Sequence, residues 1–311
     1  MSHPNSMRVL ITGSTGFIGR FLVPQLIQKP ETATSAGSVT VTLLLRETYS
    51  GRPLPAPLNQ LRPQFNIVYA DLRNFNLTVR AVREAKPDAV IHLAAAGATD
   101  PFLGVETAVR HNLTGTINLL RACFEKTFGV QQFIVARTPG ELLGINTYAA
   151  SKAAAWEFCR MYARTREWPI YGGMIFQAYG PGQPERTFIP AAFRAALAGE
   201  DFPMTAGTQA RDWIFAEDVA AGFSAMLGQP LAPATTIDIG TGTATSLIDV
   251  ATLIYQTVNR GGRPLPGTLP SRPGEDPTQT ADAANTQELI GWQAGISLVE
   301  GIKKLKLYQI K

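Results

Sequence analysis

Short apolar runs alternate with longer segments of helical periodicity through the first 176 residues. The runs are four to eight residues long and rich in valine, isoleucine and leucine, which is typical of strands buried on both faces; they lie at 7–12, 39–45, 65–70, 88–93, 132–136 and 170–176. The segments between them repeat apolar residues every three or four positions and predict helices; they lie at 17–27, 77–85, 105–124 and 147–166. This alternation predicts an α/β fold, a doubly wound and mostly parallel sheet with helices on both faces.

The pattern becomes less regular after Tyr179. Glycine and proline crowd positions 180–184 and 260–280, and these residues interrupt helices and strands. A helix is predicted at 188–197, a strand end leading into a helix at 214–227, a strand at 236–239 and a short helix in the stretch that begins at 286. The second half of the chain is therefore predicted to form a smaller region, interrupted by segments that rejoin the sheet of the first half.

Composition narrows the class of protein. The 311 residues carry a net charge of +4, with no lysine or arginine run long enough to follow a nucleic-acid backbone. No apolar run approaches the roughly 18 residues of a membrane span. Two cysteines do not form a disulfide framework, and His3, His92 and His111 lack the spacing of a metal site. We expect a cytoplasmic enzyme without metal, nucleic-acid or membrane partners, in which His92 is a core residue.

A glycine-rich loop follows the first predicted strand and opens the first predicted helix. Gly13 permits a tight turn, Gly16 lets the backbone approach a pyrophosphate, and Gly19 permits close packing of helix on sheet. The free N–H groups of the helix N-terminus then face the phosphates. We predict that the loop binds a nicotinamide dinucleotide through Gly13, Ser14, Thr15, Gly16, Phe17, Ile18 and Gly19.

The loop defines the expected domains. We predict that a Rossmann-type dinucleotide-binding domain comprises residues 1–176 and about 212–240. The smaller substrate-binding region is predicted to comprise residues of about 177–211 and 241–311.

The end of the second strand distinguishes the two nicotinamide cofactors. An acidic residue there accepts hydrogen bonds from the ribose of NAD, whereas this strand ends in Arg46, whose guanidinium suits the 2′-phosphate of NADP. We predict NADP. Glu47 follows directly, so NAD stays an alternative.

Tyr148 and Lys152 are four positions apart on one predicted helix and therefore share a face. A nearby cation favours the phenolate, so Tyr148 is predicted to act as acid or base near neutral pH. Lys152 is also predicted to hold the nicotinamide ribose.

Together these residues resemble the extended short-chain dehydrogenases/reductases, the NAD-dependent epimerase/dehydratase family that modifies nucleotide sugars. The resemblance runs nearly end to end. It rests on the glycine loop, Asp71-Leu72, 90–95, Asn112 with Gly115-Thr116, Tyr148 and Lys152, 179–182, 211–218 and 272–275.

The resemblance implies a role for each matching position. Asp71 and Leu72 would flank the adenine, Leu93, Ala94 and Ala95 would line the nicotinamide side, and Asn112 would support the cofactor. Thr138 would be the catalytic hydroxyl beside Tyr148. Arg211 and Arg272 match diphosphate-binding arginines, Gln177 would contact sugar or phosphate, and Asp218 would cap a helix. The family also implies a homodimer through the helices at 105–124 and 147–166.

Departures from the family pattern shape the predicted reaction. Ala136-Arg137 stand where serines usually precede the catalytic hydroxyl, and Pro139-Gly140 stand where the dehydratases carry an Asp-Glu pair. The second departure argues against a dehydratase. We predict a nucleotide-sugar 4-ketoreductase; the alternative is a nucleotide-sugar epimerase, such as a C4 epimerase, that holds NAD tightly. A non-catalytic binding protein is the third hypothesis, which the intact Thr138, Tyr148 and Lys152 oppose.

Overall fold

The computed structural model describes residues 6–28, 38–100, 102–126, 129–270 and 278–309. The chain divides into two compact units, each made of several segments. The first comprises residues 1–174, 220–237 and 288–292, and the second comprises 175–219, 238–287 and 293–311. Segment 212–219, grouped above with the dinucleotide-binding domain, falls in the second unit because its strand pairs with strands there.

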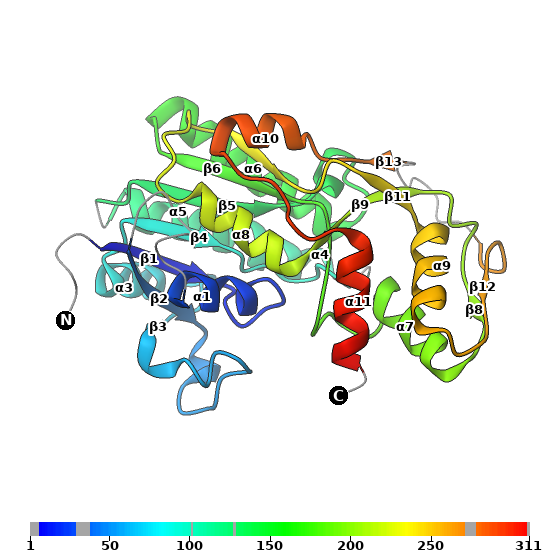
Figure 1. The fold of residues 1–311 in the computed structure, drawn as a ribbon. Coiled ribbons are helices and arrows are strands. Elements are labelled where there is room, and N and C mark those ends of the chain that lie inside the picture. Colours follow the sequence, from blue (N-terminus) through cyan, green and yellow to red (C-terminus); the bar gives the residue numbers. More distant parts are fainter. Residues whose placement is uncertain (1–5, 29–37, 101, 127–128, 271–277, 310–311) are drawn as a thin grey trace. The chain divides into compact units, whose positions relative to one another are not determined.

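A seven-stranded sheet forms the first unit's centre (Figure 1), in the order β10-β6-β5-β4-β1-β2-β3. The pairings from β3 to β6 are all parallel. The strand order reverses between β1 and β4, where the ends of two neighbouring strands leave a ligand crevice. The strands are β1 Met7–Thr12, β2 Val39–Leu45, β3 Asn66–Tyr69, β4 Ala89–His92, β5 Gln132–Arg137, β6 Ile170–Ile175 and β10 Thr236–Ile239. This confirms the predicted fold class.

Helices cover both faces of this sheet. Strand residues such as Leu10 and Phe133 pack in one apolar cluster with Val82, Leu119 and Trp156, so α3, α5 and α6 share a face. Figure 1 shows α1 and α8 on the other face. The helices are α1 Gly19–Gln28, α3 Phe75–Ala85, α4 Val105–Ala108, α5 Gly115–Phe124, α6 Thr147–Arg166 and α8 Ala216–Met226.

The segment predicted as one helix over 105–124 is divided. Between α4 and α5 the backbone winds as a π-helix, η3 Val109–Thr114. Such an insertion rotates the residues it contains and is frequent at functional sites. Here it carries Asn112, fully buried, and His111. Three short 3₁₀ turns complete the unit: η1 Glu47–Tyr49, η2 Arg62–Gln64 and η4 Pro139–Leu142.

Strand β9 organises the second unit. It pairs with β7 and β13 in parallel and with β11 antiparallel. Its Asp212 is fully buried and accepts hydrogen bonds from the backbone N–H groups of Thr241, Gly242 and Ala281 at 2.8–3.2 Å. One carboxylate thus joins two loops to β9, as buried charges require compensating donors.

The second unit's helices pack around the apolar cluster of Tyr179, Phe193, Phe215 and Ile254. Helix α9 was not predicted, although Ser246 caps it by accepting from Asp249 N–H at 3.1 Å. The elements are β7 Gln177–Tyr179, α7 Phe188–Ala198, β8 Phe202–Pro203, β9 Ala210–Phe215, β11 Ala244–Ser246, α9 Leu247–Val258, β12 Pro264–Leu265, β13 Thr278–Gln279, α10 Ala283–Ile290 and α11 Leu298–Gln309. Within the described ranges, no helix combines the length and apolarity needed to cross a bilayer.

Candidate active site

The glycine loop connects β1 to α1, and the backbone at each of its three glycines lies close to neighbouring backbone atoms. Gly13 has φ +71°, and a Cβ there would meet Ala94 N at 2.6 Å. Gly16 N–H donates to Gly13 O at 3.0 Å, and a Cβ on Gly19 would overlap Ser14. At Gly13, only glycine both adopts the left-handed conformation readily and leaves enough room for the neighbouring backbone. The loop therefore has the shape that its spacing predicted.

A pocket of about 510 Å³ lies against this loop at the carboxyl ends of β1, β2 and β4. Nine predicted residues line it: Gly13, Thr15, Gly16, Arg46, Asp71, Leu72, Leu93, Ala94 and Ala95. Six other residues predicted to bind the cofactor do not line it: Phe17, Ile18, Gly19, Asn112, Tyr148 and Lys152. Ser14 is fully buried beneath the loop, and its hydroxyl has no hydrogen-bond partner among the described residues. A buried hydroxyl without a partner, in a cradle kept open by glycines, fits a phosphate-bearing dinucleotide.

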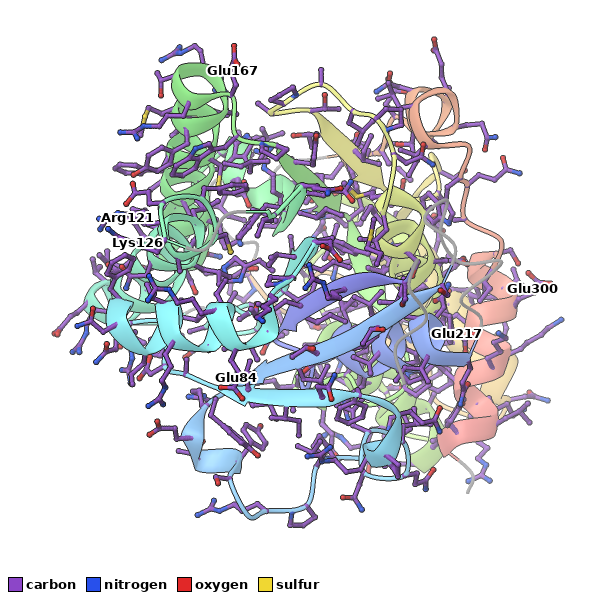
Figure 2. The ribbon with its side chains drawn as sticks, turned by 90° about the vertical axis from the view of Figure 1, so that its left-hand side faces the viewer. Glu84, Arg121, Lys126, Glu167, Glu217 and Glu300 are labelled. Carbon is purple, nitrogen blue, oxygen red and sulfur yellow. The ribbon has the colours of Figure 1, made fainter. Side chains whose placement is uncertain are left out.

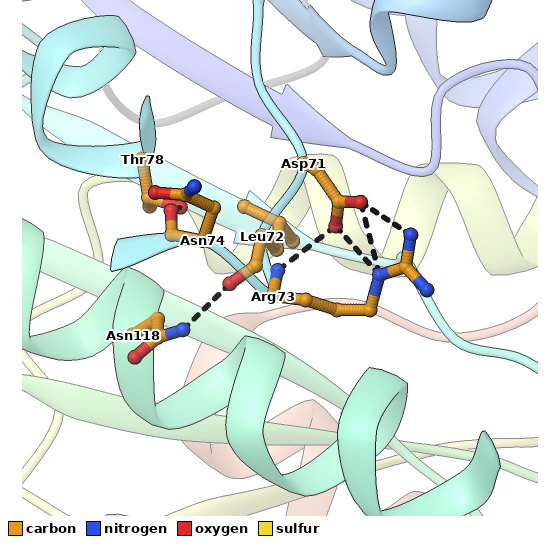
Figure 3. Close-up of polar contacts among 6 residues, drawn as sticks. All are labelled: Asp71, Leu72, Arg73, Asn74, Thr78 and Asn118. Atoms are coloured by element: carbon orange, nitrogen blue, oxygen red, sulfur yellow. Dashed lines mark hydrogen bonds and ion pairs between the residues drawn. The ribbon is translucent and has the colours of Figure 1, made fainter. Parts of the chain in front are cut away.

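Four charged or titratable side chains line the pocket. Arg46 and Asp71 were predicted from the sequence, whereas Arg73 and His111 were not. Arg73 binds the Asp71 carboxylate with Nε at 2.9 Å and Nη2 at 2.5 Å (Figure 3). This hydrogen bonding lowers the pKa of Asp71. Burial, followed by the charge of Arg73, lowers the pKa of His111.

Leu72 is positioned from the other side of the same turn. Its backbone carbonyl accepts from Asn118 Nδ2 at 2.8 Å, which ties the turn after β3 to α5 (Figure 3). Asn74 caps α3 by accepting from Leu77 N–H. The predicted adenine-flanking pair is therefore held by two helices.

His92 lies at the centre of a buried hydrogen-bond chain. Thr116 Oγ1 donates to Asn112 O at 2.6 Å, so it accepts from His92 Nε2 at 2.9 Å. The other ring nitrogen, Nδ1, then accepts from Thr12 Oγ1 at 2.7 Å, and that hydroxyl accepts from Ala94 N–H at 3.2 Å. The directions assign the neutral Nε2–H tautomer. Burial, and then the Lys152 charge, lowers the pKa of His92 to about 3.

Asn112 connects the cofactor pocket with α6. Its Oδ1 accepts from Ala96 N–H at 2.7 Å, and its Nδ2 donates to Ala96 O at 3.0 Å and to Ser151 Oγ at 2.9 Å. Ser151 in turn donates to Tyr148 O at 2.7 Å. Asn112 thus fixes the loop that follows β4 and the first turn of α6.

Tyr148 and Lys152 lie on the first turns of α6, which Asn146 caps by accepting from Ala149 N–H at 2.9 Å. Lys152 is buried, and burial lowers the pKa of its ammonium. Burial, followed by the charge of Glu141, raises the pKa of Tyr148 to about 12. This shift is opposite in direction to the expected depression by Lys152, because burial and a carboxylate both disfavour the phenolate.

Thr138 directly follows β5 and precedes η4, the turn that leads towards α6. Its backbone N–H donates to Glu141 Oε1 at 3.1 Å. The other Glu141 oxygen, Oε2, accepts from Arg137 Nε at 2.9 Å, with the two side chains 9% and 1% exposed. The turn that carries the predicted catalytic hydroxyl is therefore built on a buried ion pair, which sequence reasoning did not predict.

Gln177 and Arg211, two of the three predicted substrate-binding residues, belong to the second unit. Gln177 is exposed at the start of β7, in register with Trp213 of β9. Arg211 is buried on β9, where its Nη1 donates to Ala210 O at 2.8 Å. Arg272 lies outside the described residues. Asp218 accepts from Ile296 N–H at 2.8 Å, so it anchors the loop before α11 instead of capping its own helix.

The chain belongs to the NAD dependent epimerase/dehydratase family, whose model matches residues 9–240. The protein is thus an enzyme of the extended short-chain dehydrogenase/reductase type. It is 28% identical to the UDP-glucose 4-epimerase of Mycolicibacterium smegmatis, over 96% of this chain and 97% of that one. It is 26% identical to the dTDP-glucose 4,6-dehydratase of Neisseria gonorrhoeae, over 98% and 96%. The solved structure of MoeE5 with UDP-glucuronic acid and NAD aligns with a TM-score of 0.78 and 26% identity, over 97% and 99%.

Proposed function

We propose that this enzyme reduces the keto group of a nucleotide-diphosphate sugar with NADPH, as a 4-ketoreductase. The observation that carries the proposal is the surroundings of the predicted proton-transfer residue: burial and then the charge of Glu141 raise the pKa of Tyr148, and Glu141 itself is bound to Arg137. A general acid must carry its proton before the reaction begins. A protonated Tyr148 therefore suits reduction of a ketone better than oxidation of an alcohol.

The pocket residues support a nicotinamide cofactor. The dinucleotide supplies a hydride to the sugar carbon when bound. Gly13 and Gly16 would admit its pyrophosphate, and Ala94 and Ala95 would line its nicotinamide end. These residues fit the group because the cradle is open where a Cβ would fill it.

The charged end of the pocket favours NADP over NAD. Arg46 lines the pocket, whereas Glu47 forms an exposed ion pair with Arg80 at 3.9 Å. The Asp71 carboxylate is already bound by Arg73. Two guanidinium groups and His111 at this end are suited to a 2′-phosphate.

Tyr148 would donate its proton to the ketone oxygen as the carbon accepts hydride. The phenol O–H bond breaks and the new alcohol O–H bond forms, which leaves a phenolate. The Lys152 ammonium would stabilise that phenolate. Thr138 would hydrogen-bond the same sugar oxygen.

Dehydration of a sugar needs a free acid and a free base beside the catalytic hydroxyl. Pro139 and Gly140 have no such groups, and the Glu141 side chain is 1% exposed and paired. The local chemistry therefore supports reduction over 4,6-dehydration, although several relatives are 4,6-dehydratases.

The direct test supplies NADPH with a panel of nucleotide 4-keto-6-deoxy sugars and follows the loss of reduced-nicotinamide absorbance. We expect stoichiometric oxidation of NADPH with one of them, abolished in Tyr148→Phe. No oxidation with any member of the panel contradicts the proposal.

An epimerase is the second candidate, favoured by the similarity to UDP-glucose 4-epimerase. Such an enzyme reduces and reoxidises its cofactor within one cycle. Purified protein that retains NAD and interconverts UDP-glucose and UDP-galactose without consuming cofactor would establish it.

For the nucleotide diphosphate we propose Gln177, Arg211 and Arg272 as contacts. Guanidinium groups bind phosphates bidentately, and Arg211 is positioned by β9. Replacing either arginine by Met should raise KM for the nucleotide sugar with a smaller effect on kcat.

We also propose a homodimer through residues 105–124 and 147–166. Three apolar side chains are exposed there: Val105 at 67%, Phe158 at 41% and Val109 at 39%. Light scattering of the purified protein should give twice the 33.6 kDa chain mass. Phe158→Glu should shift the mass towards the monomer.

A further inference from the structure

The Asp71 carboxylate is fully engaged by one neighbouring residue. Its Oδ1 accepts from the Arg73 backbone N–H at 3.0 Å and from Arg73 Nε at 2.9 Å. Its Oδ2 accepts from Nε at 2.9 Å and from Nη2 at 2.5 Å. These hydrogen bonds fill the roughly four acceptor sites of a carboxylate. Asp71 therefore has no acceptor site left for the amino group of an adenine or for a ribose hydroxyl.

The Arg73 guanidinium has a second edge that the carboxylate does not use. A guanidinium can bind one pair of oxygens through Nε and one Nη, and another pair through its two Nη groups. Asp71 takes the first edge, and Figure 3 shows the other terminal nitrogen, Nη1, pointing away from it. Nη1 has no hydrogen-bond partner among the described residues. The Arg73 side chain is 36% exposed and lines the cofactor pocket, so this outer edge is open to a phosphate.

The ion pair acts on the arginine alone, because Asp71 and Arg73 lie on one turn, two positions apart. Arg8 and Asp88 form a pair of the same kind, in which the Arg8 N–H, Nε and Nη2 donate to the carboxylate at 2.7–3.0 Å. That pair joins β1 to the residue that precedes β4, 80 positions away. The pair of Asp71 joins no two elements, so its effect is to fix the direction of the guanidinium.

A second guanidinium lines the pocket at the same edge of the sheet. Strands β2 and β3 pair in parallel, so Arg46 and the turn at Asp71 leave the sheet on the same side. Arg46 has no ion-pair partner among the described residues. The carboxylate of Asp71 is already neutralised by Arg73. A phosphate bound here would therefore meet two cationic groups and no free carboxylate of the described lining.

We propose that Arg73 determines the preference for NADP by binding its 2′-phosphate through the outer edge, and that Asp71 is the positioning residue that aims this arginine. Asp71 then contacts Arg73 and not the adenine. Arg46 binds the same phosphate from the end of β2. The inference rests on the proposed use of NADP, and it deepens that proposal by naming the side chain and the edge that recognise the phosphate.

The experiment measures the affinity of the full chain for NADP and NAD by calorimetric titration, in the wild type and in Arg73→Met. Adenosine 2′,5′-bisphosphate is a third probe, since it carries the 2′-phosphate without the nicotinamide. We expect Arg73→Met to weaken binding of NADP and of this probe by about 30-fold, because a charge-assisted bidentate contact is lost. The affinity for NAD should not fall, because the released Asp71 can then accept from the ribose hydroxyls.

The conservative variant Arg73→Lys separates charge from geometry. It retains the cation, but an ammonium has no planar edges and cannot bind the carboxylate and the phosphate bidentately at once. It should recover only part of the affinity for NADP, leaving a loss of about 5-fold. Full recovery would show that charge alone suffices and would overturn the role of the outer edge.

Asp71→Asn tests the positioning role. In the wild-type background it should weaken NADP binding by about 3-fold, because Arg73 loses its direction, and leave NAD binding unchanged. In the Arg73→Met background it should strengthen NADP binding, because it removes a bare carboxylate beside the phosphate. The same change in both backgrounds would reduce Asp71 to a structural role. An equal loss for NAD and NADP would make it an adenine contact and overturn the assignment.

Two arginines outside the pocket lining serve as controls. Arg8→Met removes a guanidinium with the same pairing to a carboxylate. Arg121→Met removes one close to the same turn, since its guanidinium lies 4.6 Å from the centre of the Phe75 ring. Figure 2 shows Arg121 on the outer helix α5. Both affinities should stay unchanged in each control, and a loss equal to that of Arg73→Met in either would overturn the assignment.

The outcomes separate this inference from the proposed function. Equal affinities of the wild type for NADP and NAD would refute both the proposed cofactor and the role of Arg73. A preference for NADP that survives in Arg73→Met overturns only the role of Arg73 and leaves the preference with Arg46. A preference lost in Arg73→Met, in a protein that reduces no keto sugar, supports this inference while the proposed reaction fails.

Discussion

The glycine loop after β1 and the turn after β5 both bring backbone to the carboxyl edge of the same sheet, but they are built differently. The loop is shaped by absent side chains: Gly13 approaches Ala94 where no Cβ fits. The turn is shaped by two buried charges, Arg137 and Glu141, that satisfy each other. Missing side chains leave room at the loop, whereas paired charges hold the backbone of the turn that begins at Thr138.

This difference determines how each region tolerates substitution. In the loop, an added methyl group is harmful because it occupies space that the ligand or the backbone needs. At the turn, a deleted charge is harmful because its partner stays buried without compensation. Four substitutions, in these two regions and in the residues near them, test these expectations.

The largest effect is expected for Arg137→Met. It leaves the Glu141 carboxylate buried and unpaired, and breaking such a pair costs about 3–5 kcal/mol. Urea denaturation followed by tryptophan fluorescence measures the loss. The double variant with Glu141→Gln should recover most of it; equal stability of the single and double variants would show that the charge is not the cause.

Gly13→Ala should weaken binding of NADP and NAD alike by about 100-fold, because the left-handed conformation and the contact with Ala94 both oppose a side chain. Calorimetric titration with each dinucleotide measures this. Gly51 is a matched control: its φ is +70°, but nothing lies within 4 Å of a Cβ there. Gly51→Ala should leave the affinity unchanged, and a similar loss in it would refute the role of close approach.

His92 hydrogen-bonds Thr12 at the end of β1, and its contribution to stability depends on pH. Its pKa of about 3 in the folded protein is below the usual 6.5, so the unfolded chain takes up the proton first. Stability is thus complete above pH 6.5 and falls as the pH drops towards 3, by about 2 kcal/mol at pH 5. Denaturation of wild type and His92→Gln from pH 8 to 5 should show this component only in wild type; parallel pH profiles would exclude it.

Arg46→Ser is expected to have the smallest effect. It should lower the affinity for NADP by about 10-fold and leave NAD unchanged, because one of several cations near the 2′-phosphate is lost. Added salt should reduce the difference. Glu47→Gln, whose side chain lies in the exposed pair with Arg80, serves as control. An equal loss for both cofactors would argue against 2′-phosphate recognition.

The sequence determined the elements whose signals are local. The short apolar runs and the period-3.6 pattern placed β1, β2, β10 and α6 at their observed bounds, and the spacing of Gly13, Gly16 and Gly19 predicted a cradle that the structure contains. The family assignment followed from the same local motifs. Short segments of sequence are enough to predict where glycine shapes the backbone and which residues of an element are buried.

Only the tertiary structure decided how charged groups are used. Asp71 was expected beside adenine and is bound by Arg73, and the Tyr148 pKa is raised where Lys152 was expected to lower it. The partners of Arg137 come from η4, α6 and β10, up to 99 residues away. The electrostatic energy of a charged side chain depends on its burial and on all the charges around it in space. It therefore cannot be predicted from a local sequence pattern.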